Sequence, residues 1–305
     1  MQASGLQEMG LLMHKIILGI DENGLGPLLG PLVITGILVK YHESTTNWFK
    51  DITDSKEFFK VRTKSKFGVL EETVISLFYL IKERVPTSPI EIFESFCLPY
   101  KCSSDINICT NKLPTEFLWA DTEKSKKRCT DFSSWADKNN LKLQSINSIF
   151  VCPKEINSFT KENTKLFLDF ISFCNIIRRV NNKENLEVFA GKIGGLKFYY
   201  PYLKYVMKDY DIEIITETME ESIYILSKED ASIRLGFFMN VEKHSFPAAL
   251  SSIVGKYIRE LSMFSVRQNL GIKEDVSGYH DKKTKRFVSN LDFRNVPKEC
   301  VFRET

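Results

Sequence analysis

Residues 15–39 read KIILGIDENGLGPLLGPLVITGILV, and this stretch decides the fold. The apolar run 15–20 predicts a short buried strand, and the Asp-Glu-Asn-Gly that follows it predicts a turn. Residues 31–39 are rich in β-branched side chains and predict the next strand. The stretch therefore predicts two strands joined by a glycine-rich turn, with two acids, Asp21 and Glu22, at the end of the first strand.

The rest of the chain alternates between helical and extended patterns. The expected helices cover residues 67–80, 163–177, 247–268 and 282–291, and the expected strands cover 186–190, 211–218, 223–226 and 233–239. Residues 87–150 are less regular, and we interpret them as an irregular insertion. The alternation predicts an α/β domain with a mixed sheet, an enlarged middle region and a C-terminal helical portion.

The composition is that of an ordinary globular protein. Apolar residues make up 43% and charged residues 27% of the 305 residues, which excludes a disordered chain. The net charge of +3 is too small to indicate a nucleic-acid partner, so a local basic patch would have to supply one. Seven cysteines without a CxxC pair predict reduced thiols. The sequence has neither an apolar stretch of membrane-spanning length nor a basic leader, which predicts a cytoplasmic protein.

The adjacent acids Asp21 and Glu22 are the first candidates for chemistry. Side chains alternate between the faces of a strand, so both acids serve one site only if the chain leaves the strand at Glu22. Asn23 and Gly24 permit that exit, because both residue types tolerate a positive φ. Two hard oxygen donors at a strand end suit Mg²⁺ or Mn²⁺ better than zinc. The alternative is a polar turn between two strands.

Five segments resemble the type 2 ribonuclease H (ribonuclease HII) family, in the family's order. Residues 19–38, GIDENGLGPLLGPLVITGIL, resemble the signature D-E-A-G-R-G-P-L-x-G-P. The other matches are 54–56 (DSK) to D-S-K, 188–194 (VFAGKIG) to V-x-V-D-x-x-G, 252–260 (SIVGKYIRE) to A-S-I-x-A-K-V-x-R-D, and 277–279 (SGY) with 283–284 (KT) to S-G-Y-P-x-D-x-K-T. The resemblance covers roughly residues 14–292 apart from the middle region, and the first motif is the specific one.

The resemblance implies a ribonuclease H-like fold with a mixed five-stranded sheet, in a single domain over residues 14–305 that follows an extension over 1–13. It implies an endonuclease that hydrolyses the RNA strand, or embedded ribonucleotides, of RNA/DNA duplexes. Four family carboxylates hold two divalent cations, Mg²⁺ or Mn²⁺; one activates water and the other stabilises the leaving oxygen. By position, Asp21, Glu22 and Glu260 are the expected catalytic metal ligands, although Glu260 stands where the family has aspartate. A surface charge is the alternative for Glu260.

Two positions depart from the family pattern. The remaining family aspartate falls on Gly191, which has no side chain, and Lys192 would place a positive charge near the metal. Glu242, close to an acidic family position outside the metal ligands, and Glu187 are possible substitutes. The arginine of the family's G-R-G loop is Leu25 here, so its contact with phosphate is lost. A catalytically impaired relative that binds nucleic acid without cutting it, or another hydrolase such as a DNA nuclease, therefore remains open.

The resemblance also implies a substrate-binding surface for a nucleic-acid duplex. Its expected members are Gly24, Leu25, Gly26, Lys56, Lys256, Tyr279, Lys282 and Lys283. The glycine backbone would meet a 2′-hydroxyl, the tyrosine would stack on a sugar at an RNA–DNA junction, and the lysines would pair with phosphates. A packed aromatic and surface lysines are the alternatives. The aromatic stretch 197–202 is expected in the core. The expected protein is a monomer without a membrane partner.

Overall fold

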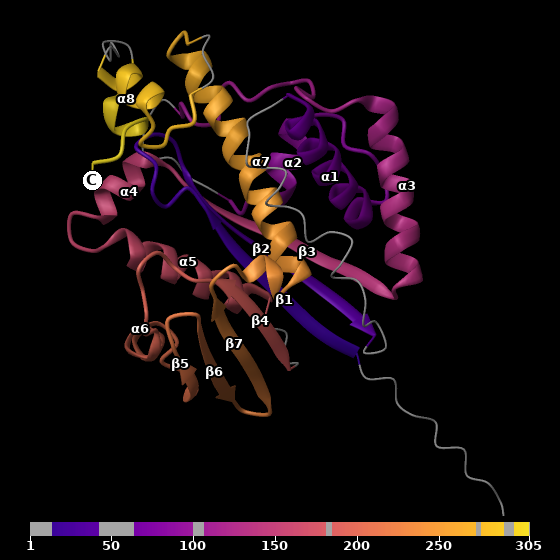
Figure 1. The fold of residues 1–305 in the computed structure, drawn as a ribbon, viewed down its shortest axis with the longest axis vertical. Coiled ribbons are helices and arrows are strands. Elements are labelled where there is room, and N and C mark those ends of the chain that lie inside the picture. The colour runs from indigo at the N-terminus through magenta and orange to yellow at the C-terminus, as the bar shows by residue number, and fades with distance from the viewer. Residues whose placement is uncertain are drawn as a thin grey trace, which may run out of the picture.

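A computed structural model describes residues 14–42, 64–99, 107–180, 185–272, 276–289 and 296–304. Within these ranges a mixed sheet carries helices on both faces (Figure 1). The strands are β1 His14–Asn23, β2 Leu32–His42, β3 Leu141–Val151, β4 Leu186–Gly191, β5 Asp211–Glu217, β6 Glu221–Lys228 and β7 Ala231–Phe238. The predicted α/β class and the mixed sheet are confirmed.

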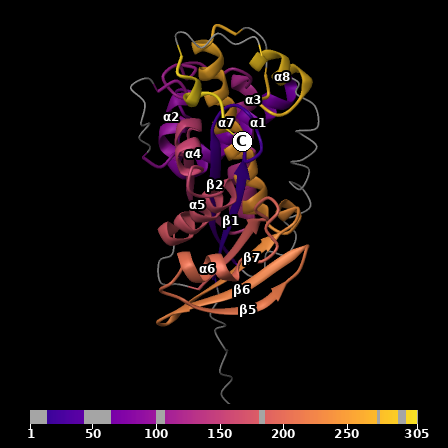
Figure 2. The same ribbon diagram turned by 90° about the vertical axis from the view of Figure 1, so that its left-hand side faces the viewer.

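The described part of the sheet has seven strands, in the order β3-β2-β1-β4-β7-β6-β5, so the expected number of five is wrong. β3 adds an edge strand beside β2. β6 and β5 extend the opposite side of the sheet beyond β7 (Figure 2). β1 runs parallel to β4, and β4 runs parallel to β7. The carboxyl ends of these three strands therefore meet at one edge of the sheet.

The helices cover the two faces unequally. Their bounds are α1 Lys64–Lys82, α2 Pro89–Phe96, α3 Thr122–Lys138, α4 Pro153–Phe159, α5 Lys165–Val180, α6 Tyr200–Val206, α7 Phe246–Asn269 and α8 Lys282–Ser289, with 3-10 turns η2 Val241–Lys243 and η3 Lys298–Cys300. The longest helix, α7, crosses β1 and β2 on the face that α1 to α3 also cover, whereas α5 and α6 belong to the opposite face (Figure 1).

The alternation of side chains along β1 explains this layering. Ile17 points into the core shared with α7, and Leu18 and Ile20 point into the core shared with α5. Gly19 faces α7 at very short range, because a Cβ there would lie 2.0 Å from the backbone nitrogen of Ala248. Close packing at Gly19 thus places the N-terminal part of α7 directly against β1. Because side chains alternate, it also sets which of the two acids, Asp21 or Glu22, faces α7.

The middle region is more ordered than its sequence indicates. Residues 87–150, expected to be irregular, contribute α2, α3 and β3. The strand β3 pairs along its length with β2, and α3 packs on α1. The interpretation of this region as irregular is therefore wrong, because it completes one edge of the sheet and one side of the α7 core.

Two expectations fall partly outside the structure. The extension 1–13 and the segment 54–56, with Lys56, lie outside the described residues. Among the helices of the ranges given above, none combines the length and the apolar character that a membrane crossing requires.

Candidate active site

Acidic residues collect at the edge where β1, β4 and β7 end. Asp21 and Glu22 occupy the end of β1, Gly191 ends β4, and Glu242 lies in the η2 turn just after β7. A cavity of about 480 Å³ opens at this edge, and Asp21, Gly191 and Glu242 line it. The parallel arrangement of three strands thus places two acids that are more than 200 residues apart in sequence on one cavity wall.

Asp21 is the acid on the α7 side of the sheet. Its carboxylate accepts a hydrogen bond from the side chain of Ser252 in α7. Burial raises the pKa of Asp21 to about 7, and the negative charges of Glu22 and Glu242 raise it further, while the Ser252 bond opposes the rise. Glu242 itself is buried, with 8% of its surface exposed. Asp21 and Glu242 therefore lie at the same cavity, close enough for their negative charges to repel each other.

Glu22 does not leave the strand, and the expectation that it does is wrong: β1 continues to Asn23, and Glu22 pairs with Ile34 of β2. Because side chains alternate along a strand, Glu22 lies on the sheet face opposite to that of Asp21. The Oε2 atom of Glu22 accepts a hydrogen bond from the backbone N–H of Leu25 at 3.0 Å, which closes the glycine-rich turn. Burial raises the pKa of Glu22, whereas the Leu25 N–H and the guanidinium groups of Arg303 and Arg259 lower it. The carboxylate is thus held in place by one backbone amide and two buried cations.

Asp169 is an acid of this site that the sequence reading missed. It lies on α5 with none of its surface exposed. Burial raises the pKa of Asp169 well above its ordinary value, and the nearby charges of Glu22 and Asp21 raise it further. The sequence signal was available, because Asp169 is the one charged residue in the largely apolar run of residues 166–174.

Asp21 occupies the space into which a side chain at position 191 would extend, and Lys192 lines the same cavity. A Cβ at Gly191 would lie 2.8 Å from Oδ1 of Asp21, so a side chain there would point directly at that carboxylate. The ammonium group of Lys192 donates hydrogen bonds to the Thr218 carbonyl at 2.6 Å and to the Ser222 hydroxyl at 3.3 Å. The ammonium group of Lys192 is therefore held by Thr218 and Ser222, while the residue lines the same cavity as Asp21.

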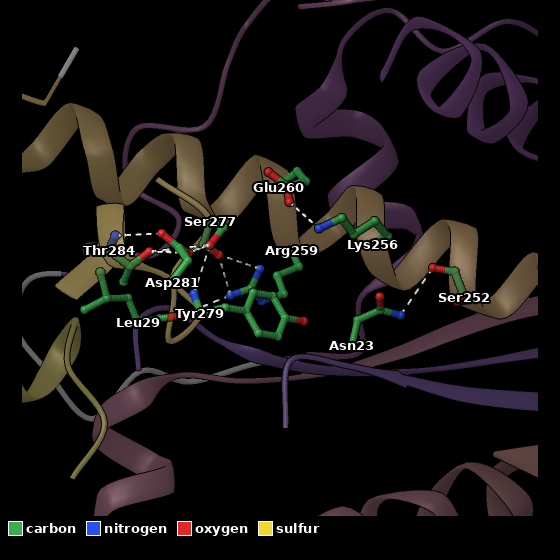
Figure 3. A network of polar contacts seen from close by, with 10 residues as sticks. All are labelled: Asn23, Leu29, Ser252, Lys256, Arg259, Glu260, Ser277, Tyr279, Asp281 and Thr284. Carbon is green, nitrogen blue, oxygen red and sulfur yellow. Dashed lines mark hydrogen bonds and ion pairs between the residues drawn. The ribbon is translucent and has the colours of Figure 1, made fainter. Parts of the chain in front are cut away.

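Glu260 does not join the acids at the end of β1. It is buried on α7 and forms an ion pair with Lys256 at 2.6 Å. Asp21 contacts α7 at Ser252, eight residues earlier, which corresponds to about 12 Å along the helix. Figure 3 shows Glu260 and Arg259 on different sides of α7. The sequence correctly put an acid on this helix, but the structure brings Glu242, not Glu260, to Asp21.

Glu187 does not replace the missing acid either. It pairs with Arg234 at 3.6 Å in the middle of the sheet. Four residues of extended chain separate Glu187 from Gly191, which is about 13 Å. Of the two substitutes that the sequence offered, only Glu242 lies at the cavity.

The pKa of Asp21 leads to a prediction about stability without added metal. In the folded protein the carboxyl group of Asp21 keeps its proton up to about pH 7, whereas in the unfolded chain it releases the proton near pH 4. The folded state thus binds more protons between these limits, so this group makes stability fall as pH rises from 4 to 7. Asp21→Asn should remove that contribution, which is below about 1.4 kcal/mol per pH unit.

Urea unfolding of the wild type and Asp21→Asn at pH 4, 5, 6 and 7 measures this difference. The free energy of unfolding of the variant, relative to that of the wild type, should increase with each increase in pH. Parallel pH profiles would contradict the assignment of a proton to Asp21 in the folded state.

The glycine-rich turn after β1 is held by two buried arginines. Gly24 has a φ of +100°, as expected for the exit from the strand. Arg259 of α7 donates to the Leu29 carbonyl at 3.2 Å, and Arg303 donates to the Gly30 carbonyl at 2.8 Å and to that of Gly24. Both guanidinium groups are fully buried, so the hydrogen bonds that hold the turn are made from the protein interior. Neither arginine was singled out from the sequence.

The segment 277–279 lies against this same turn. The backbone N–H groups of Leu28 and Leu29 donate to the Gly278 carbonyl at 2.8 and 3.1 Å. Arg259 donates to the Ser277 carbonyl at 3.3 Å, and its guanidinium lies 5.1 Å from the ring centroid of Tyr279 (Figure 3). Tyr279 is 42% exposed. Two motifs 250 residues apart thus form one surface that presents an aromatic ring beside Gly24 and Arg259.

The predicted basic residues are distributed over different places. Lys282 is exposed at the start of α8, close in sequence to Tyr279, and Lys283 belongs to the same helix. The ammonium group of Lys256 is directed toward Glu260. The aromatic stretch 197–202 packs as expected at Tyr199, which is fully buried and stacks on Phe237 with ring centroids 3.9 Å apart.

A substitution at Gly24 tests whether the turn requires glycine. A Cβ at Gly24 would lie 2.7 Å from Nε of Arg259 and 2.8 Å from the Pro31 carbonyl oxygen. Gly24→Ala should therefore lower the free energy of unfolding by roughly 1–3 kcal/mol, because a positive φ is strained for alanine. Gly26→Ala is the matched control, since no atom lies within 4 Å of its added Cβ. Equal stability of the two variants in urea would refute the role of Gly24.

Comparisons with known proteins were made on the whole chain. No protein-family model matches it. The chain is 25% identical over 198 residues to Ribonuclease HII of Methanococcus vannielii, covering 63% of this chain and 73% of the relative. It is 26% identical over 214 residues to Ribonuclease HII of Methanosphaera stadtmanae, covering 66% and 91%. A chain in the structure of the PCNA:RNase HII complex from Archaeoglobus fulgidus is 13% identical, with a TM-score of 0.47 over 94% of this chain and 93% of that one.

Proposed function

We propose, since this chain is a divergent member of the ribonuclease HII family with a ribonuclease H-like fold, that it is a ribonuclease H-type endonuclease. Its proposed substrate is the RNA strand, or an embedded ribonucleotide, of an RNA/DNA duplex. The proposed cofactor is Mg²⁺ or Mn²⁺. We further expect a monomer that acts in the cytoplasm. The relatives named Ribonuclease HII support the general activity, and the site described above supports the chemistry.

One observation supports this proposal most directly: Asp21 and Glu242 line one open cavity at the carboxyl ends of β1 and β7, and Glu22 is the next residue after Asp21 in β1. Burial raises the pKa of Asp21, and repulsion from the charges of Glu22 and Glu242 raises it further. A protein without use for such a group would gain stability by replacing it with neutral residues. The arrangement is typical of a site that binds a cation.

The donor set fits a hard divalent cation. Asp21 and Glu242 would hold it from the cavity side and Glu22 from the turn, and all three present carboxylate oxygens. Throughout the ranges that the structure describes, no group of three or more His, Cys, Asp or Glu side chains already surrounds a common point. Binding would therefore draw the carboxylates closer together. The bound cation supplies an activated water and stabilises the leaving oxygen.

The remaining roles fall to residues of the turn and of the segment 277–279. Gly24 and Gly26 leave the backbone bare, so a ribose 2′-hydroxyl can approach it. Tyr279, supported from below by Arg259, offers a ring for stacking on a sugar or base. Lys282 and Lys283 lie next in the chain and would contact phosphates of the same duplex. Leu25 packs toward Gly194, so phosphate binding at the turn has no arginine from this position.

A catalytically impaired relative is the second candidate, and Gly191 favours it. The family aspartate at this position has no counterpart on β4, and a side chain there would collide with Asp21 as it is placed in this structure. Such a protein would keep the surface around Tyr279 and bind the duplex without cutting it.

A cleavage assay separates these candidates. Labelled duplexes with one embedded ribonucleotide, with a complete RNA strand, and with DNA only are incubated with the protein in Mg²⁺, Mn²⁺ or EDTA. The proposal predicts cleavage of the two ribonucleotide-containing duplexes with either metal and none in EDTA. Binding without cleavage in both metals would favour the impaired relative, and cleavage of the all-DNA duplex would favour a DNA nuclease.

A further inference from the structure

We infer that Asp169 is a metal-ligating carboxylate of this chain and replaces the acid that is missing at Gly191. The inference rests on the proposed function, because it names a further ligand for the same cation site. Asp169 comes from α5, on the sheet face opposite to α7, so the replacement would reach the site from a different element.

The contacts of Asp169 distinguish it from a structural carboxylate. It is completely buried, and within the described residues neither of its carboxyl oxygens has a hydrogen-bond partner. A buried carboxylate without hydrogen bonds is strongly destabilising, so such groups are rare unless they serve a ligand.

Glu71 shows how this protein satisfies a buried acid that has a structural role. Its two oxygens accept hydrogen bonds from the backbone N–H groups of Trp119 and Ala120, both at 2.7 Å, and from the hydroxyl of Tyr257 at 2.9 Å. Both acids have no exposed surface. The contrast indicates that the carboxyl group of Asp169 serves a bound ligand and not the hydrogen-bond network of the protein itself.

Asp169 lies near the two acids at the end of β1. The charges that act on it most strongly are those of Glu22 and Asp21. One turn earlier on α5, Leu166 lies beneath the loop after β4, because a Cβ at Gly194 would be 2.5 Å from its Cδ2 atom. The first turns of α5 thus lie under the same edge of the sheet at which β1 and β4 end.

The chemistry of the replacement follows from counting carboxylates. Gly191 removes one acid from the wall formed by β4, and Asp169 adds one beneath Glu22. With Asp21, Glu22 and Glu242 the site again has four carboxylates. A divalent cation relieves the repulsion among them and gives the two oxygens of Asp169 a partner. No covalent step is involved.

Metal binding to Asp169→Asn tests this inference. Mn²⁺ is titrated into metal-free wild type, Asp169→Asn and the control Glu187→Gln, with heat and the Mn²⁺ spin-resonance signal as readouts. Loss of a ligand should raise the dissociation constant for Mn²⁺ of Asp169→Asn by at least roughly 10- to 100-fold. This is the range found when a residue that only hydrogen-bonds to a metal ligand is replaced. Glu187→Gln, which changes an exposed pair with Arg234, should bind as the wild type does.

Thermal unfolding of the same three proteins adds an independent readout. Without metal and at neutral pH, Asp169→Asn should unfold at a higher temperature than the wild type, because burial opposes ionisation of Asp169 in the folded state whereas the unfolded chain ionises it freely. With excess Mn²⁺ this gain should be smaller. Unchanged Mn²⁺ affinity, or a lower unfolding temperature without metal, would overturn the role of Asp169 and leave the proposed function intact. A wild type that binds no Mn²⁺ would overturn both.

Discussion

Asp21→Asn is expected to reduce metal-dependent cleavage of a ribonucleotide-containing duplex by roughly 10³-fold or more. Asp21 is the acid on which the charges of both Glu22 and Glu242 act, and a cation held there would contribute several kcal/mol to transition-state stabilisation. The amide has nearly the same shape as the carboxylate and keeps one oxygen toward Ser252, so the fold should persist. Single-turnover cleavage rates with Mg²⁺ and with Mn²⁺ measure the effect.

Two further variants locate the remaining ligand on the α7 side. Glu242→Gln should lower the cleavage rate strongly, because Glu242 shares the cavity with Asp21. Glu260→Gln should leave that rate near the wild-type value once the fraction of folded protein is accounted for, because its carboxylate pairs with Lys256 about 12 Å farther along α7. The reverse order of effects would restore Glu260 as the ligand and refute the assignment of Glu242.

Helices and strands with a regular repeat of apolar residues could be predicted from the sequence. Those whose buried residues are small or polar could not. The long helix α7 buries a continuous apolar stripe, which its 3.6-residue period announces. The helix α3 buries only Ser125, Cys129 and Ala136, so its sequence shows no such stripe. In β3 the pairing with β2 shifts between Val39 and Leu38, where Gln144 is skipped, and the alternation along the strand is interrupted.

The candidate site divides in the same way. Asp21, Glu22 and Gly24 lie within four consecutive residues. One motif was therefore sufficient to single them out and to predict the positive φ of Gly24. Glu242 reaches Asp21 only because β1, β4 and β7 are parallel neighbours, which no local pattern specifies. Glu260 had a fitting motif, but the direction of α7 carries it away from the cavity. Spatial order of strands, rather than local spacing, decided which acids met.

Arg259→Ala is expected to lower the free energy of unfolding by roughly 3–5 kcal/mol. The fully buried guanidinium donates to the carbonyls of Leu29 and Ser277, and hydrogen bonds from a charged group contribute about 1.5–3 kcal/mol each. The same group lowers the pKa of Glu22, so the variant should also hold that proton more tightly. Arg259→Lys keeps the charge but lacks the planar fork, and we expect an intermediate loss.

Urea unfolding with Arg234→Ala as the control measures this effect. Arg234 forms an exposed pair with Glu187, and its removal should cost less than about 1 kcal/mol. Beyond stability, loss of Arg259 removes the cation beneath the ring of Tyr279, so duplex affinity of the folded fraction should fall with it. A variant that unfolds like Arg234→Ala would mean that the turn after β1 and the segment 277–279 hold together without Arg259. The contacts of Gly278 with Leu28 and Leu29 would then be sufficient to join the acids to the stacking surface.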